Sequence, residues 1–99
     1  MIKCYHVISK DHWNKEKDSN LFGQYELNNY GFIHSSTLKG LSKIIDRYLE
    51  NEKDYLILKL YVDEDMVKYE DKDIEQLYPH FYSLIDKKYI KSVIELADF

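Results

Sequence analysis

Four short motifs carry the side chains that could bind a ligand or transfer a proton. They are residues 5–6, 31–36, 68–70 and 78–82, which include three histidines, a serine pair and a glutamate. An imidazole titrates near neutral pH and can also bind a metal ion. A carboxylate can transfer a proton or accept a hydrogen bond from a hydroxyl group. These residue types suit a site for a small polar ligand, although each motif alone could also have a purely structural role.

His34 illustrates the two interpretations. It closes an expected strand at 31–34, just before a helix, where its side chain and free backbone N–H groups could bind an anion. In the structural alternative, His34 makes only a hydrogen bond at the strand end and Ser36 only caps the helix. Glu70 could bind a ribose hydroxyl or act as an acid or base, but in an acidic run a solvated carboxylate is the ordinary outcome. His80 could likewise be a ligand or a half-buried histidine with its own hydrogen bond.

The elements that would position these motifs follow from the apolar spacing. Residues 55–62 are apolar on both faces except at Lys59, which predicts the central strand. Apolar residues at helical spacing predict one long helix at 37–49, and Ser9 could cap a short, superficial helix at 10–17. The other expected segments are strands at 2–9, 31–34, 66–70, 80–84 and 89–96 and an ordered loop at 18–29. The residues expected in the core are Leu41, Ile45, Leu56, Leu58 and Leu60.

The order of these elements predicts the fold class. Strands and helices do not alternate as in βαβ units, so we expect an α+β fold with a mainly antiparallel, split sheet, one long helix and one short helix. A chain of 99 residues cannot be divided into two cores, which predicts a single domain, residues 1–99. We expect it to be a monomer or a weak dimer.

Composition narrows the range of partners and compartments. Lys and Arg number 14 against 18 for Asp and Glu, so the net charge of −4 argues against binding nucleic acid or an anionic membrane surface. The single Cys4 allows no internal disulfide, and no stretch approaches the roughly 20 apolar residues of a membrane span. A cytoplasmic location is therefore expected. The ten tyrosines suit half-buried strands but can equally line a pocket.

Taken together, the motifs resemble a known family. The segments GFIHSST at 31–37, DRY at 46–48, DYLIL at 54–58, YE at 69–70 and YPHFY at 78–82 are similar to the pattern of the small bacterial and plant family called domain of unknown function 952. Tyr5, His6 and Trp13 match further positions of that pattern. The resemblance covers nearly the whole chain.

The resemblance implies an ADP-ribosyltransferase-like fold, with an order of elements similar to the tRNA 2′-phosphotransferase branch and a cleft that binds NAD or a related nucleotide. On this basis Glu70 would stabilise the positive charge that forms on the ribose when the nicotinamide bond breaks. His34, the second residue assigned to catalysis, would hold ribose or phosphate together with His6 and Ser36. The other residues expected to contact the nucleotide are Arg47, His80 and Tyr82, the last by stacking on a base.

Two further functions stay open. The first is a non-catalytic module that senses a ligand or binds a protein, in which the same motifs only shape the fold. The second is a metal site formed by His6, His34 and His80, for which the sequence has no local spacing such as His-x-x-x-His. Whether the protein is an enzyme is left undecided, and NAD is a hypothesis for its cofactor.

Overall fold

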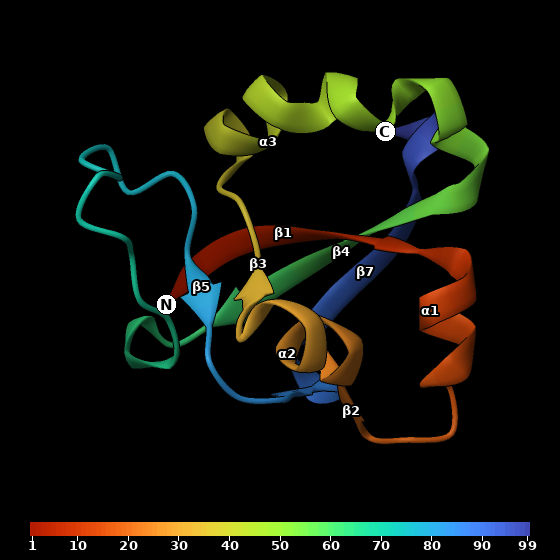
Figure 1. Cartoon of the computed structure of the whole chain (residues 1–99), viewed down its shortest axis with the longest axis horizontal. Helices are drawn as coiled ribbons and strands as arrows, with labels where there is room; N and C mark the ends of the chain where they lie inside the picture. Colours follow the sequence, from red (N-terminus) through yellow and green to blue (C-terminus); the bar gives the residue numbers. More distant parts are fainter.

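A three-stranded antiparallel sheet forms the centre of the molecule (Figure 1). The computed structural model describes residues 1–99. The sheet has the order β1 (Ile2–Ser9), β4 (Tyr55–Val62) and β7 (Ile90–Glu95). β1 and β4 pair over their full length, from Ile2 opposite Val62 to Ser9 opposite Tyr55. The two strands expected at 2–9 and 55–62 are confirmed, and the strand expected at 89–96 is β7.

Two short ladders complete the strand content. β2 (Leu21–Phe22) pairs with β6 (Ile85–Asp86), and β3 (Ile33–His34) pairs with β5 (His80–Phe81). All pairings are antiparallel. An α+β fold with antiparallel strands in separate sheets is therefore confirmed.

The prediction of one long helix at 37–49 is wrong. α3 (Leu38–Ile44) begins after Thr37, whose hydroxyl accepts a hydrogen bond from the Gly40 N–H, and it ends after seven residues. The chain continues as a 3-10 helix, η1 (Ile45–Asp54). Both kinds of helix place residues three apart on one side, so the apolar spacing that predicted the element does not distinguish them.

The prediction of an ordered loop at 18–29 is also wrong in part, because this segment contains β2 and most of a second helix, α2 (Gln24–Tyr30). Gly23 and Gly31 flank α2 with φ values of 107° and 80°, a left-handed conformation that glycine adopts easily. A Cβ on Gly23 would lie 2.1 Å from Cδ1 of Ile33. The two glycines therefore define the ends of a short helix. The expected helix at 10–17 is α1 (Lys10–Lys15), with the predicted Ser9 cap accepting the His12 N–H.

The strand expected at 66–70 does not form. A 3-10 turn, η2 (Glu64–Met66), follows β4, and only a single bridge joins Lys68 to His80. The last turns of the chain are the 3-10 segments η3 (Lys87–Tyr89) and η4 (Leu96–Asp98). No helix is both long and apolar enough to cross a membrane.

Two hydrophobic clusters pack on opposite faces of the sheet, as strand alternation requires. The first contains Cys4, Ile8, Leu56, Leu58, Leu60 and Val62, and α2 packs against it through Leu27. The second contains Tyr5, Leu41, Ile44, Ile57 and Leu96. Figure 1 accordingly shows α2 and α3 on opposite sides of the central strands. Of the five predicted core residues, four are buried and Ile45 is half-buried.

Candidate functional site

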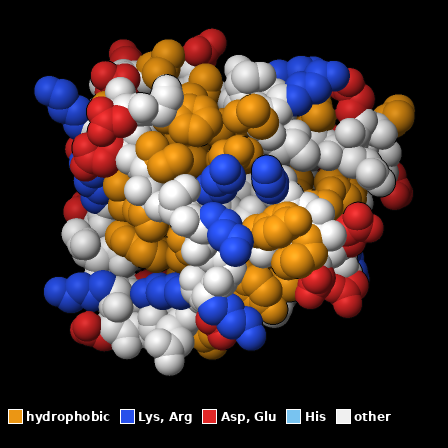
Figure 2. Space-filling model, turned by 180° about the vertical axis from the view of Figure 1, so that it is seen from behind, with side chains coloured by type: hydrophobic (Ala, Val, Ile, Leu, Met, Phe, Trp, Pro, Cys, Tyr) orange, Lys and Arg blue, Asp and Glu red, His pale blue; other side chains and the backbone are white.

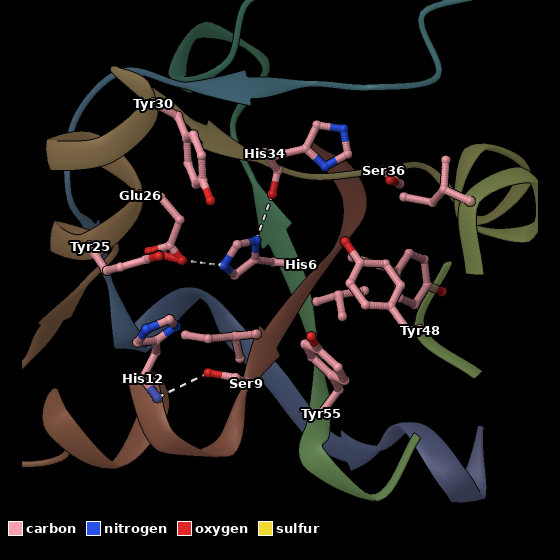
Figure 3. A pocket seen from close by; sticks show the side chains of 14 residues that line it. His6, Ser9, His12, Tyr25, Glu26, Tyr30, His34, Ser36, Tyr48 and Tyr55 are labelled. Carbon is pink, nitrogen blue, oxygen red and sulfur yellow. Dashed lines mark hydrogen bonds and ion pairs between the residues drawn. The ribbon is translucent and has the colours of Figure 1, made fainter. Parts of the chain in front are cut away.

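A cavity of about 310 Å³ opens beside β1, between α2 on one side and the α3–η1 segment on the other (Figure 3). Three residues expected to contact a ligand, His6, His34 and Ser36, line it together. β1 brings His6, and the segment from β3 to α3 brings the other two. Its volume lies at the lower end of the roughly 300–1,000 Å³ typical of ligand pockets.

His6 and Glu26 form a buried pair in the wall of this cavity. Nδ1 of His6 lies 2.6 Å from the carbonyl oxygen of His34, and Nε2 lies 3.2 Å from Oε2 of Glu26. A carbonyl only accepts hydrogen bonds, so Nδ1 carries a proton and donates it. The 3.2 Å contact between Nε2 and Oε2 is a hydrogen bond when one further proton lies between the two atoms. The pair therefore fixes both side chains in the wall of the cavity.

The carboxyl of Glu26 has a free acceptor oxygen. Burial raises its pKa, but the hydrogen bond and charge of His6, a backbone hydrogen bond and the charge of His12 together lower it by more, so the pKa of Glu26 lies below its ordinary value. The residue is only 8% exposed, and its Oε1 atom is buried without a hydrogen-bond partner. An unsatisfied buried carboxylate oxygen is costly. A ligand N–H or O–H group placed in the cavity would satisfy it.

His34 is neutral at physiological pH. Burial, followed by the charges of His80, His6 and Arg47, lowers the pKa of His34 to about 4. A neutral imidazole can donate and accept hydrogen bonds but offers no positive charge to a phosphate. His34 therefore suits a ligand hydroxyl or ring nitrogen.

The expectation of free backbone N–H groups after His34 is wrong. Ser35 donates its N–H to Pro79, Ser36 to Tyr5 and Thr37 to Leu77, all within 3.1 Å. These donors are occupied because Ser36 forms a β-bridge with Tyr5 of β1 and because the 77–79 segment lies beside residues 35–37. The cap of α3 is Thr37, one of the three residues at 35–37 whose side chains could cap this helix. The N–H groups of residues 35–37 are therefore not available to an anion, and Ser36 faces the cavity with its side chain.

Aromatic rings flank the cavity on two sides. From the α1 and α2 side, His12 stacks on Tyr25 with ring centroids 3.8 Å apart. From the other side, Tyr48 and Tyr55 meet edge to face at 4.9 Å. Figure 3 shows both sets around the His6–Glu26 pair, with the Tyr30 ring beside Glu26. A flat ligand would meet ring faces and edges as well as polar groups.

A second, smaller cavity of about 240 Å³ holds two further predicted residues, Glu70 and His80. His34 lines both cavities. His80 lies directly opposite His34 on β5, is 5% exposed, and stacks on Phe32 at 4.3 Å. Burial lowers the pKa of His80 against the opposing charges of Glu70 and Asp73, and its buried Nδ1 atom has no hydrogen-bond partner. Glu70 itself is exposed and does not reach the first cavity.

The structure does not bring the remaining two predicted residues to either cavity. Arg47 is exposed on η1 and lines neither of them. Tyr82 is 53% exposed, and its ring lies 5.7 Å from the Lys68 ammonium, beside a separate hollow. No group of three or more metal-binding side chains is arranged to hold a metal ion.

Sequence reasoning missed Glu26, the acidic partner of His6. A carboxylate in a polar segment that is expected to be a loop looks like an ordinary surface residue. The pair of glycines at 23 and 31 could have indicated Glu26, because these glycines mark the two ends of one short helix that packs against the core. Phe22 and Leu27, buried or half-buried on each side, then mark the face on which Glu26 lies.

The fold and the site define a small α+β domain with a ligand-sized cavity at the edge of its central sheet. Residues 7–93 match the family described as Protein of unknown function (DUF952), and the chain belongs to this family. The crystal structure of protein CC0527 from Caulobacter crescentus is similar, with a TM-score of 0.76 at 17% identity over 95% of this chain and 85% of that one. The solution structure of CC0527 matches with a TM-score of 0.73 at 18% identity over 96% and 84%. No curated protein sequence matches the chain.

Proposed function

We propose that the protein binds a small molecule with a flat ring and a hydrogen-bond donor in the cavity beside β1. The observation that carries this proposal is the buried Oε1 atom of Glu26, which has no partner and belongs to a residue that lines the cavity. His6 holds Glu26 in place, because Nδ1 of His6 is itself fixed by the His34 carbonyl. The tyrosine rings supply the contact surface for the ring of the ligand.

A nucleotide with a nicotinamide group fits this chemistry. The carboxamide N–H group of nicotinamide is a donor suited to Oε1 of Glu26, and its ring suits the aromatic walls. The cavity is small, so the rest of a dinucleotide would have to extend past His34 toward Glu70 and His80. His34 lines both cavities, which supports a ligand that spans them. We therefore propose that the nicotinamide group of NAD occupies the cavity, with the phosphates outside it, since neutral His34 offers them no positive charge.

If the bound NAD is cleaved, the positive charge forms on the ribose bonded to nicotinamide, and Glu70, which lines only the second of the two cavities, can stabilise it only where that ribose extends past His34. If it is not cleaved, the same contacts describe a sensor. The unsatisfied Glu26 oxygen supports binding in both cases and favours neither, so turnover is a separate question for experiment.

Calorimetric titration with nicotinamide, NAD, ADP-ribose and AMP tests the proposal. Binding of nicotinamide or NAD should weaken about five-fold in Glu26→Gln, because the amide keeps an acceptor oxygen but replaces a hydrogen bond to a charged group, about 1.5–3 kcal/mol, with a neutral one of about 0.5–1.5 kcal/mol. Glu50→Gln, an exposed change on η1, is the matched control and should bind normally. Absence of binding by all four ligands, or equal binding by the two variants, would refute the proposal.

Release of nicotinamide from NAD separates the enzyme from the sensor. If turnover occurs, Glu70→Gln should reduce it by about 10²–10³ and leave binding almost unchanged. Binding without release identifies a sensor, and turnover that survives in Glu70→Gln removes the catalytic role from that residue.

A further inference from the structure

Three lysines gather on one face of the central sheet, one from each strand. In the register of β1 and β4, Lys3 lies opposite Tyr61 and Tyr5 lies opposite Lys59. Opposed residues share a face, and so do residues two apart on one strand. Lys3 and Lys59 therefore project from the same face, at neighbouring positions.

A β-bulge adds Lys91 to this group. The pairing of β4 with β7 runs regularly to Lys59 opposite Ser92 and then shifts to Leu60 opposite Ile90, so Lys91 is the extra residue. Its ammonium lies 5.7 Å from the ring centroid of Tyr61, on the face of the other two lysines. Bulges redirect side chains in this way, often near functional sites. We call Lys3, Lys59, Lys91 and Tyr61 the lysine face.

The lysine face is unneutralised in a protein that has an excess of acids. None of its three lysines forms an ion pair, although Asp and Glu outnumber Lys and Arg by 18 to 14. α3, η1 and η4 cover the same side of the sheet around Tyr5 and Ile57 and leave the lysine end open. Figure 2 shows Lys and Arg side chains gathered at the centre of the molecule seen from behind, with hydrophobic side chains beside them. Like charges on one face of a sheet repel one another, so an anionic partner would stabilise them.

The outer edge of β7 is also unpaired. β7 bonds only with β4, and the backbone hydrogen bonds of turns, loops and caps include none from residues 91–94. An open strand edge can accept a further strand from another chain. On the face opposite the lysines, Val93 lies against Leu58 in register and is 46% exposed.

We propose that β7 binds an extended acidic segment of a partner protein, which adds to the sheet as a fourth strand. Side chains of an added strand alternate between the two faces. On one face its carboxylates contact Lys91 and Lys59, and on the other its apolar residues cover Val93. The structure thus specifies both the mode of binding and the pattern of the partner, in which acidic and apolar residues alternate.

Two alternative roles for the lysine face account for fewer of these features. A charge and a bulge on an edge strand also prevent aggregation, which accounts for Lys91 but not for Lys3 and Lys59 on the inner strands. A nucleic acid would meet only three lysines and a net charge of −4, which repels a long polyanion. Charge complementarity and the free edge together favour the acidic strand.

The test uses a short labelled peptide that alternates Glu and Val, with backbone amide shifts recorded by NMR and affinity by fluorescence anisotropy. The peptide should shift amides in residues 90–95, and its affinity should fall as salt rises. Lys91→Glu and Lys59→Glu should each weaken binding about five-fold or more. Lys15→Glu, an exposed change on α1 with the same effect on net charge, is the matched control and should bind normally.

A second peptide tests strand addition itself. Methylation of alternate backbone nitrogens on the peptide edge that faces β7 should abolish binding, whereas methylation of the other set should preserve it. Equal loss in Lys15→Glu and Lys91→Glu, shifts confined to other segments, or tighter binding of a single-stranded oligonucleotide would each overturn the proposal. So would self-association through β7 that excludes the peptide, because the occupant would then be a second copy of the chain. Thermal unfolding of each variant distinguishes loss of the surface from loss of the fold.

Discussion

The His6–Glu26 pair makes a quantitative prediction for stability. Glu26→Leu removes the carboxylate and leaves Nε2 of His6, in a side chain only 4% exposed, without a partner. A buried polar group without a partner costs about 1–3 kcal/mol. In a domain of this size that loss lowers Tm by at least about 4 °C. Glu26→Gln should cost less, because its amide keeps polar atoms within hydrogen-bond reach of Nε2 of His6.

The dependence on pH distinguishes a charged pair from a merely well-packed one. The pKa of Glu26 is lower in the folded protein than in the unfolded chain. Its carboxylate therefore contributes stability at pH values above the unfolded pKa, and this contribution is lost as the pH falls through the folded pKa.

Urea unfolding of wild type and Glu26→Gln from neutral to acid pH measures this contribution. The stability gap should be largest near neutral pH and should shrink on acidification below the ordinary range of a carboxyl. Glu50→Gln, exposed and outside any ion pair, should show little gap at any of these pH values. The reasoning would be refuted if wild type and Glu26→Gln had the same free energy of unfolding at neutral pH, or if the difference between them stayed constant into strong acid.

Three further predictions test other parts of the structure. Gly40→Ala should destabilise the fold by about 1–3 kcal/mol in urea unfolding despite the helix preference of Ala, because its Cβ would lie 2.6 Å from the Leu77 carbonyl oxygen; an unchanged or higher stability contradicts this packing. An NMR titration should show His34 gaining its proton only near pH 4, since burial lowers its pKa to about that value; a midpoint near 6.5 disproves the burial. Cys4 should not react with a thiol reagent at pH 8 in the native state, because burial raises its pKa to about 11 and the side chain is inaccessible; rapid labelling of folded protein contradicts this.

The central strands were predictable because their apolar patterns fit a strand and no other element. The run at 55–62 is apolar on both faces, and the run at 2–9 suits the strand beside it, so both bounds agree with the structure. Helices were harder. At 37–49 the spacing fits α and 3-10 geometry equally, and α2 is too short to show an apolar period.

Part of the site was predictable for a different reason. The grouping of His6, His34 and Ser36 came from a family resemblance that covers nearly the whole chain, and the structure places all three on one cavity. Glu26 was not predictable because its burial depends on how α2 docks on the core. The N–H groups at 35–37 are occupied by the carbonyls of Pro79, Tyr5 and Leu77, which are all distant in sequence, so no local pattern contains these contacts.

The full-length pairing of β1 with β4 has a consequence for how the protein can be probed and altered. His6 lies opposite Leu58, and its neighbours Tyr5 and Val7 point to the other face. A slip of one residue between these strands would turn every side chain of β1 to the opposite face. The histidine would then leave Glu26 and enter the second hydrophobic cluster. A misaligned folding intermediate therefore lacks the cavity, and binding of the proposed ligand would report correct strand alignment during refolding. An insertion within β1 would abolish the cavity and the core together.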